Sequence, residues 1–369
     1  MTGWTAGQYR LWRGLVGILI LAQWTFLWPG LASVDLTFSS FWEGGLSVLI
    51  IVSALSLVLG IRSRLSAVLI LAAYSVLLLF DFEVVRLADP SFLPLCFHLF
   101  IPAGSVQLPD ARGREGSRSG WQLPAGVWRV LHTLLTLALA SLSASMLLPL
   151  FSDTGAVAVR EIALATLGGG CAIGFSIPGL RRYAWFASLS LLLFFAFGGL
   201  CWGLLALLLL AFEPAWLGPI RPGTTDRVFF DDSCGICRCS VHFLITEDRD
   251  RTSFRFAPQK SRAYLNSIPS ETRGELPDSV VVLQESGKIL VYSDAAIDFC
   301  QRLGGYWRVI GAIGKLIPRF IRDYLYQSLA RVRYRLFPMP KENDLARQLA
   351  SGDRLLPGAL EEWEPDGKE

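Results

Sequence analysis

Lysine is absent from the first 213 residues of this 369-residue chain, and charged residues of all kinds make up only 18% of the whole. An ordinary soluble chain has about a quarter of its residues charged. The shortage lies in the N-terminal part, because charges of both signs alternate freely after residue 225. The composition therefore predicts two parts that face different surroundings.

The chain also lacks a large charge excess and a dense cysteine pattern. Its net charge of +3 is spread along the sequence, which is too little to make nucleic acid the expected partner. Its seven cysteines are widely spaced and odd in number, unlike the framework of a small disulfide-stapled secreted domain. Both classes are therefore excluded.

Long uncharged runs recur in the N-terminal part. A helix needs about 20 apolar residues to cross a bilayer, because the hydrocarbon is about 30 Å thick and each residue rises about 1.5 Å. The first run is too long for the core of a signal peptide. The runs predict an α-helical polytopic membrane bundle of seven or eight spans in a domain of residues 1–220. They cover residues 14–34, 44–61, 65–80, 90–109, 130–152, 162–180 and 183–212.

Arginine predicts the orientation of these spans, since basic loops stay on the cytoplasmic side. Alternate connections carry ten arginines against two on the opposite side, which places the N-terminus in the cytoplasm. The last run is longer than one span, and Gly198 and Gly199 lie at its middle. If they form a hairpin tip, the following domain returns to the cytoplasm, whereas a continuous helix leaves it outside. We favour the return.

Two segments carry a resemblance in this part. The N-terminal part resembles the horizontally transferred transmembrane family, the bundle shared with vitamin K-dependent carboxylases, and more distantly DoxX-like proteins. The resemblance lies in its span order and in the segments "HLFIPAGSVQLPDA" and "LLLFFAFGGLCWGLLALLLLAF". Those carboxylases use a lysine base, which is missing here, so carboxylation is not implied. Polar groups in hydrocarbon are candidates for function, but packing is the favoured role of His98, His132, Cys96, Cys171 and Cys201.

A Cys-x-x-Cys motif follows at Cys234 and Cys237. The preceding "RVFF" is β-branched and aromatic and ends at a polar pair, as strands do, and a helical pattern begins at Cys234. Free N–H groups and the dipole at a helix start favour a thiolate over a thiol. We expect Cys234 to be the exposed attacking thiolate, and Cys237, almost one turn on, to resolve the mixed disulfide.

The segment "FFDDSCGICRCSVHFL" resembles the DCC family of predicted thiol-disulfide oxidoreductases, named for an Asp-x-x-Cys-x-x-Cys motif that Asp231, Cys234 and Cys237 match. The likeness continues through "FRFAPQ", "LPDSVVVL", "YSDAAIDFCQRLGG" and "IPRFIRDYLYQSLARVRYRLF". It departs at Val332, where the family commonly has Asn, and by the extra Cys239. The resemblance implies a redox domain over residues 226–337 that requires no organic cofactor.

The coarse order of this domain is strand, helix, strand, helical stretch, two strands and further helices, which is the thioredoxin-like α/β arrangement. In such folds a proline before the third strand, often cis, faces the active cysteines. Pro277 is the candidate, with an ordinary turn proline as the alternative. Asp231 either acts as a general base for Cys237, with its pKa raised by burial, or caps the helix.

Metal binding is the competing chemistry, because Cys234, Cys237, Cys239 and His242 lie within nine residues. Structural zinc normally uses two separated ligand pairs, whereas these side chains point in different directions around one helix. We therefore expect no metal. Cys239 and Cys300 are then buried or spare thiols, and a regulatory disulfide with either remains an alternative.

The end of the chain is basic and then polar. Residues 306–337 hold seven lysines and arginines against one acid, Asp323, among many apolar side chains. Such segments bind anionic membrane surfaces, or form the solvated face of a domain helix. Residues 338–369 are rich in proline, glycine and acids, which predicts a mobile polar tail.

The first functional hypothesis is a membrane-tethered thiol-disulfide oxidoreductase, in the cell membrane with its redox domain on the cytoplasmic side. Its partners are membrane lipid and an unknown thiol or disulfide substrate and electron donor. The second is a non-catalytic redox sensor or scaffold that controls the membrane bundle. The third is a membrane reductase or transporter that receives electrons from the redox domain.

Overall fold

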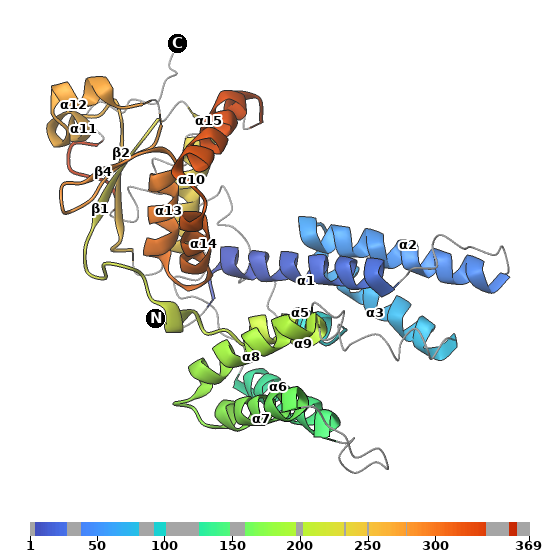
Figure 1. The fold of residues 1–369 in the computed structure, drawn as a ribbon. Coiled ribbons are helices and arrows are strands. Elements are labelled where there is room, and N and C mark those ends of the chain that lie inside the picture. The colour runs from blue at the N-terminus through green and yellow to red at the C-terminus, as the bar shows by residue number, and fades with distance from the viewer. Residues whose placement is uncertain are drawn as a thin grey trace. The chain divides into compact units, whose positions relative to one another are not determined.

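The computed structural model describes residues 4–27, 38–80, 92–100, 125–147, 159–196, 202–231, 234–248, 251–277, 279–336 and 354–359. They form two compact units (Figure 1). The N-terminal unit takes its described residues from 9–212, and the C-terminal unit takes them from 213 onward together with residues 4–8. The first domain was expected to contain residues 1–220, so the start of the chain is assigned differently here.

The described part of the N-terminal unit is helical. Each helix buries a stripe of apolar side chains at the spacing of three and four residues that one helical face requires, as Ile50, Ala54 and Leu57 do. Packed pairs include α2 with α3, α6 with α7, and α7 with α8. The helices are α1 (Ala6–Leu27), α2 (Phe38–Leu59), α3 (Ser63–Phe80), α5 (Phe92–Phe100), α6 (Ala125–Leu147), α7 (Val159–Ser176), α8 (Arg181–Ala196) and α9 (Trp202–Leu210).

Within the described residues, no helix unites the length and the apolar character that a bilayer crossing needs. The predicted membrane bundle of seven or eight spans is therefore wrong. The prediction counted uncharged residues, and two of these runs do not coincide with single long helices. The described helix in run 90–109 is α5, whose nine residues extend about 14 Å at about 1.5 Å each. Run 183–212 is divided between α8 and the nine-residue α9.

Several related expectations stay predictions. Gly198 and Gly199, the supposed hairpin tip, lie outside the described residues, as does Cys201. The side of the membrane, the location in the cell membrane and the lipid partner stay predictions, as does the character of the tail, of which only residues 354–359 are described.

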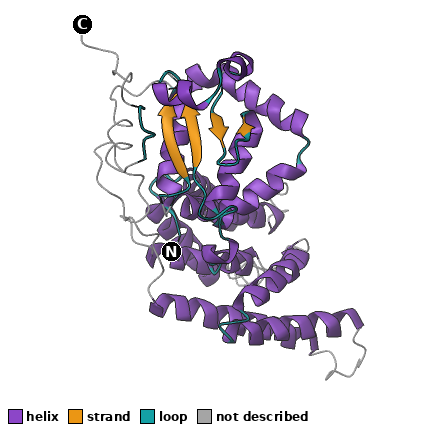
Figure 2. Cartoon of the chain, turned by 90° about the vertical axis from the view of Figure 1, so that its left-hand side faces the viewer, coloured by secondary structure: helices purple, strands orange, loops and turns teal. Residues whose placement is uncertain are grey.

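A mixed four-stranded sheet organises the C-terminal unit, in the order β2-β1-β3-β4 (Figure 2). Strand β1 (Asp226–Phe230) runs parallel to β2 (Phe254–Pro258) and antiparallel to β3 (Val281–Leu283), and β3 runs antiparallel to β4 (Ile289–Leu290). Parallel neighbours need a crossover connection. Helix α10 provides the one between β1 and β2, and the order of strands and helices agrees with the sequence-based expectation.

Helices cover both faces of this sheet. Because successive strand residues point to opposite faces, Val228 and Phe230 pack in a cluster with α10 and α13, whereas Phe229 packs with Tyr264 of α11. The sheet thus lies between two apolar layers. The helices of this unit are η4 (Pro214–Leu217), α10 (Gly235–Glu247), α11 (Arg262–Ser267), α12 (Ser270–Glu275), α13 (Tyr292–Leu303), α14 (Gly305–Leu316) and α15 (Arg319–Leu336).

A buried ionic cluster fixes the segment before β1. Arg302 of α13 is 1% exposed, and its Nε lies 3.2 Å from a carboxylate oxygen of Asp226. The same guanidinium donates hydrogen bonds to the carbonyls of Ile220 at 2.9 Å and Ser253 at 3.1 Å. Arg302 therefore joins the linker, β1 and the start of β2 in one network.

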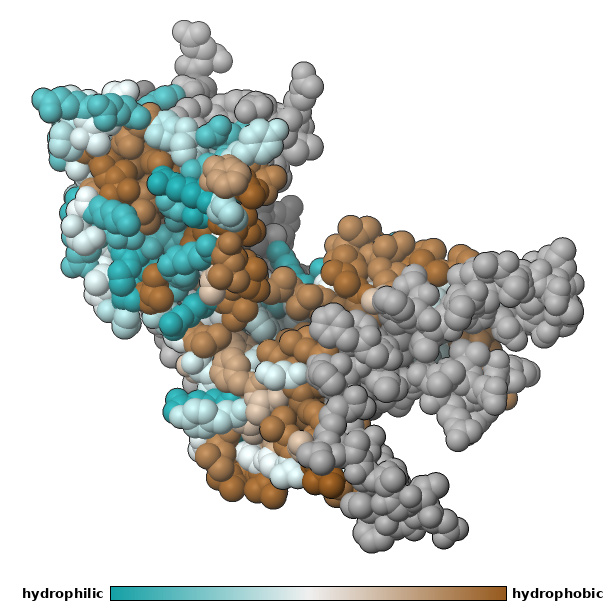
Figure 3. Space-filling view, viewed as in Figure 1, coloured by the Kyte–Doolittle hydropathy of each residue, from teal (hydrophilic) through white to brown (hydrophobic). Residues whose placement is uncertain are grey.

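The basic C-terminal segment forms α14 and α15. Apolar side chains are exposed along both helices, and Leu316 and Phe320 show 82% and 74% of their surface. Figure 3 shows apolar surface on this unit. Lys315 and Arg319, which directly precede these two residues, are exposed as well. The amphipathic character expected of this segment is present, and its binding to a membrane surface stays a prediction.

Candidate active site

The two cysteines of the motif lie where β1 leads into α10. Cys234 is the N-cap residue, with an extended backbone at φ −103° and ψ 116°, and Cys237 stands in the first turn. The amide of Arg238 donates to the carbonyl of Cys234 at 3.1 Å, which closes that turn. The predicted strand-to-helix junction is confirmed.

The sulfur of Cys234 accepts two hydrogen bonds from Cys237. The backbone N–H of Cys237 donates to it across 3.3 Å, and the thiol of Cys237 donates across 2.7 Å. The two cysteines do not form a disulfide, which would bring the sulfurs to about 2.05 Å. Donors aimed at one sulfur favour negative charge on it. The geometry therefore favours negative charge on Cys234 over Cys237, and the roles of attacking and resolving thiol stay predictions.

Both thiols are buried. Cys234 is 0% exposed and Cys237 3%, and they belong to an apolar cluster with Val241 of α10, Phe256 of β2 and Val280. The expectation of an exposed Cys234 is wrong, because the first turn of α10 packs against the face of the sheet. A substrate can reach the sulfur only after this apolar cover moves.

Asp231 is connected to the pair through its backbone. It follows β1 and is half-buried, and its carbonyl accepts the N–H of Cys234 at 3.4 Å. The alternative role of helix cap belongs to Cys234, whose sulfur accepts the amide that a cap side chain would bind. The sequence did not indicate that Cys234 would cap its own helix. Action of the Asp231 carboxylate as a general base stays a prediction.

Pro277 lies before β3, as expected. All described peptide bonds are trans, so Pro277 does not have the cis form that is frequent at this position in such folds. Its carbonyl accepts the N–H of Ser279 at 2.8 Å, and the side-chain amide of Gln259 donates to the carbonyl of Ser279 at 2.7 Å. Val280 then enters the cysteine cluster. The turn at Pro277 thus leads the chain into contact with that cluster, and a direct role in substrate binding stays a prediction.

The remaining candidate ligands near the motif are dispersed. In the described parts of the chain, three or more Cys, His, Asp or Glu side chains nowhere gather as a metal site would require. Cys239 is exposed and His242 is half-buried. Cys300 is half-buried on α13, and burial raises the pKa of its thiol to about 11. At neutral pH Cys300 is therefore a protonated, poorly reactive thiol.

Two buried carboxylates at the far end of α10 were not anticipated. Glu247, 2% exposed, accepts the amide of Gly7 at 2.8 Å and the indole N–H of Trp307 at 2.6 Å, as well as the hydroxyl of Thr5. The next residue, Asp248, is 5% exposed. No local pattern in the sequence distinguishes these acids from solvated ones. Distant segments therefore hold the end of the helix that carries the cysteines at its start.

The other chemically capable side chains belong to the N-terminal unit. His98 hydrogen-bonds through Nδ1 to the Tyr9 hydroxyl, and burial lowers its pKa to about 4. Burial lowers the pKa of His132 to about 4 as well, and its Nδ1 lies 3.1 Å from the carbonyl of Trp128. Both imidazoles are neutral at physiological pH and packed, in agreement with the packing role.

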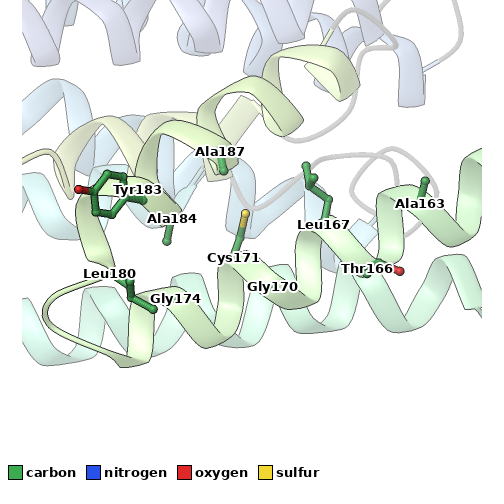
Figure 4. A pocket seen from close by; sticks show the side chains of 10 residues that line it. All are labelled: Ala163, Thr166, Leu167, Gly170, Cys171, Gly174, Leu180, Tyr183, Ala184 and Ala187. Carbon is green, nitrogen blue, oxygen red and sulfur yellow. The ribbon is translucent and has the colours of Figure 1, made fainter.

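Helices α7 and α8 flank an open pocket of about 630 Å³ (Figure 4). Cys171 and Gly174 of α7 and Ala184 of α8 line it, and its other lining side chains are mostly small or apolar. Thr166 and Tyr183 contribute the only hydroxyls. The pocket offers little chemistry, so the cysteine pair is the principal candidate site.

Part of the C-terminal unit is similar to known proteins. Residues 228–338 match the family described as DCC1-like thiol-disulfide oxidoreductase, so the resemblance seen in the sequence is confirmed for this domain. A chloroplastic DCC family protein of Arabidopsis thaliana is 29% identical over 110 residues, which cover 30% of this chain and 63% of that protein. The uncharacterised protein YuxK of Bacillus subtilis is 29% identical over 119 residues, which cover 31% of this chain and 82% of that protein.

The chain thus spans less than two thirds of the Arabidopsis relative. No solved structure matches the chain.

Proposed function

We propose that Cys234 and Cys237 catalyse two-electron exchange between dithiols and disulfides. The observation that carries the proposal is the pair of hydrogen bonds from Cys237 to the sulfur of Cys234, at 3.3 Å from its amide and 2.7 Å from its thiol. The family match over residues 228–338 supports the same class of reaction. The chemistry needs no group beyond the two thiols and a substrate disulfide.

The reaction has two displacement steps. The Cys234 thiolate attacks one sulfur of a substrate disulfide, so that a mixed disulfide forms, the substrate S–S bond breaks and one substrate thiolate leaves. Cys237 then loses its proton and attacks the Cys234 sulfur. The bond from Cys234 to the substrate breaks, and the second substrate thiol leaves. The protein dithiol has lost two electrons to the substrate, and an external dithiol restores it by the reverse steps.

The geometry favours the second step. The two sulfurs are already 2.7 Å apart, so resolution is intramolecular and has the advantage of a held, oriented nucleophile. We assign Asp231 to the removal of the Cys237 proton, on the basis of its position at the end of β1 beside the amide of Cys234. We assign Pro277 to positioning Ser279 and Val280 beside the cysteine cluster.

A non-catalytic redox switch is the second candidate, because both thiols are buried. Such a pair can be oxidised without receiving successive substrates. The two functions differ in turnover, since an enzyme converts many equivalents of disulfide and a switch converts one.

The test is a turnover assay on the full chain. Glutathione is the reductant, and bis(2-hydroxyethyl) disulfide or disulfide-bonded insulin is the substrate. The wild-type protein is expected to reduce many equivalents of substrate disulfide, and Cys234→Ser is expected to reduce none. The controls Cys239→Ser and Cys300→Ser should reduce as many equivalents as the wild type. A single equivalent reduced, followed by a stable Cys234–Cys237 disulfide, would select the switch. Turnover that survives Cys234→Ser would overturn both.

A further inference from the structure

A short segment near the C-terminus lies along the edge of the sheet. The amide of Phe256 in β2 donates to the carbonyl of Arg354 at 2.8 Å, and the amide of Leu356 donates to the carbonyl of Phe256 at 3.0 Å. Leu355 is thereby bridged in parallel to Phe256. Since β2 is the outer strand of the sheet, residues 354–359 satisfy polar backbone groups that an edge strand leaves open.

A buried ion pair anchors this segment. Arg354 is 2% exposed, and its Nη1 lies 3.1 Å from a carboxylate oxygen of Asp248. Its Nη2 also donates to the carbonyl of Asp248 at 2.9 Å. Asp248 is the residue that ends α10. An arginine held by a carboxylate and a carbonyl of one residue fixes the register of the segment.

Apolar contacts complete the site. Leu355 packs against the clusters on both faces of the sheet, while Leu356 and the 1%-exposed Ala359 pack against the one that contains Phe229 and Tyr264. Gly358 adopts φ +79° between them, a conformation that side chains other than hydrogen disfavour. The segment thus offers an arginine, two leucines and, after a turn, a small buried residue.

The strands that receive the segment are formed without it. All four strands lie within residues 226–290, and the family match ends at residue 338. The segment therefore lies outside the matched domain and contacts it as an added strand. This is the β-strand addition by which sheet edges bind extended peptides, with main-chain bonds for affinity and side-chain contacts for specificity.

We propose that the edge of β2 and Asp248 form a peptide-binding site, occupied here by the chain's own residues 354–359. Its ligand is an extended peptide with an arginine, two apolar residues and a small residue three positions after the second. The site is distinct from the cysteine pair. Helix α10 has 13 residues between the two, a separation of about 20 Å at about 1.5 Å per residue.

The test uses full-length chains and a fluorescent peptide of residues 352–361. Arg354→Glu places a second negative charge beside Asp248, so residues 354–359 should leave the site. The peptide is then expected to bind this chain about tenfold or more tightly than the wild type, whose site is filled, since one charge-assisted hydrogen bond amounts to a factor of that order. Exchange of the Phe256 amide with solvent should become faster in Arg354→Glu and slow again when the peptide saturates it.

A charge reversal provides the control. In the chain with both Asp248→Arg and Arg354→Glu, residues 354–359 should again occupy the site, and the added peptide should not bind. The chain with Asp248→Arg alone should bind only the peptide that carries Arg354→Glu. If Arg354→Glu loses amide protection in α13 as well, the milder Arg354→Gln takes its place with the same expectations. Peptide binding that ignores the charge at residue 248, or no binding to any vacated chain, would overturn the proposal.

Discussion

The backbone N–H of Cys237 points at the sulfur of Cys234 across 3.3 Å. The first cysteine therefore caps the helix on which the second cysteine stands. A cap position gives a thiolate a hydrogen-bond donor and the positive end of the helix dipole, while burial of the same sulfur, 0% exposed, opposes its charge. Under the proposed function, Cys234 should therefore react only with a substrate that displaces its apolar cover.

Cys300 should make the C-terminal unit sensitive to alkaline pH. Its thiol has a pKa raised to about 11 by burial, from 9.0 in an exposed thiol. Between these values the unfolded chain ionises and the folded one does not, so stability is full below pH 9 and is lost as pH rises toward 11. The loss from this thiol is at most about 3 kcal/mol. The free energy of unfolding of wild type and Cys300→Val, measured against pH, should differ in this slope. Equal slopes would contradict the assignment.

Trp307→Phe should destabilise the C-terminal unit. The change removes the indole N–H that donates to Glu247 at 2.6 Å but keeps an aromatic ring beside Phe243. A buried carboxylate that loses a donor costs about 2 kcal/mol. Hydrogen exchange of the β1 amides in urea measures the free energy of opening of this unit.

A double-mutant cycle supplies the control for this prediction. In a Glu247→Leu background the carboxylate is absent, so Trp307→Phe should cost much less than it does in the wild type. If the cost of Trp307→Phe is the same in both backgrounds, the indole contributes through packing and not through the hydrogen bond.

Arg302 and Arg319 each form an ion pair with an aspartate, but the pair of Arg302 is buried and that of Arg319 is exposed. Arg302→Met should destabilise the unit by about 3–5 kcal/mol, because the fully buried Asp226 carboxylate loses its buried cation and keeps only the 30%-exposed Arg221. Arg319 is 64% exposed where it lies 3.3 Å from Asp294, and Arg319→Met should cost about 1 kcal/mol or less. The same hydrogen-exchange measurement compares them. Similar costs would show that burial does not determine the strength of the Arg302 cluster.

The strand-to-helix junction that carries Cys234 and Cys237 could be predicted because its signals are local. The β-branched and aromatic "RVFF" ends at a polar pair just before a helical pattern, and β1 and α10 form there. Burial was not predictable, because Cys234 is covered by residues such as Phe256 and Val280, which are distant in the sequence. The same holds for the contacts that Glu247 makes with Thr5 and Trp307.

In the N-terminal part, composition alone did not predict where the helices begin and end. Uncharged runs were equated with single spanning helices, but a lack of charge does not determine where a helix begins and ends. Helix α5 is only nine residues long, and α7 ends at Ser176 before the run itself is over. Helix boundaries depend on turns such as the one after Ser176, and these are weakly marked in an apolar sequence.

Trapping of mixed disulfides tests the central claim that Cys234 attacks and Cys237 resolves. Full-length Cys237→Ser, reduced and then exposed to glutathione disulfide or a peptide disulfide, should accumulate one adduct at Cys234, because no thiol 2.7 Å away remains to release it. Cys234→Ser should accumulate no adduct at Cys237, and the wild type should end as the intramolecular disulfide. Peptide mapping by mass spectrometry locates each adduct. Adducts that form at Cys237 in Cys234→Ser as readily as at Cys234 in Cys237→Ser, or a wild type that forms no Cys234–Cys237 disulfide, would contradict the account.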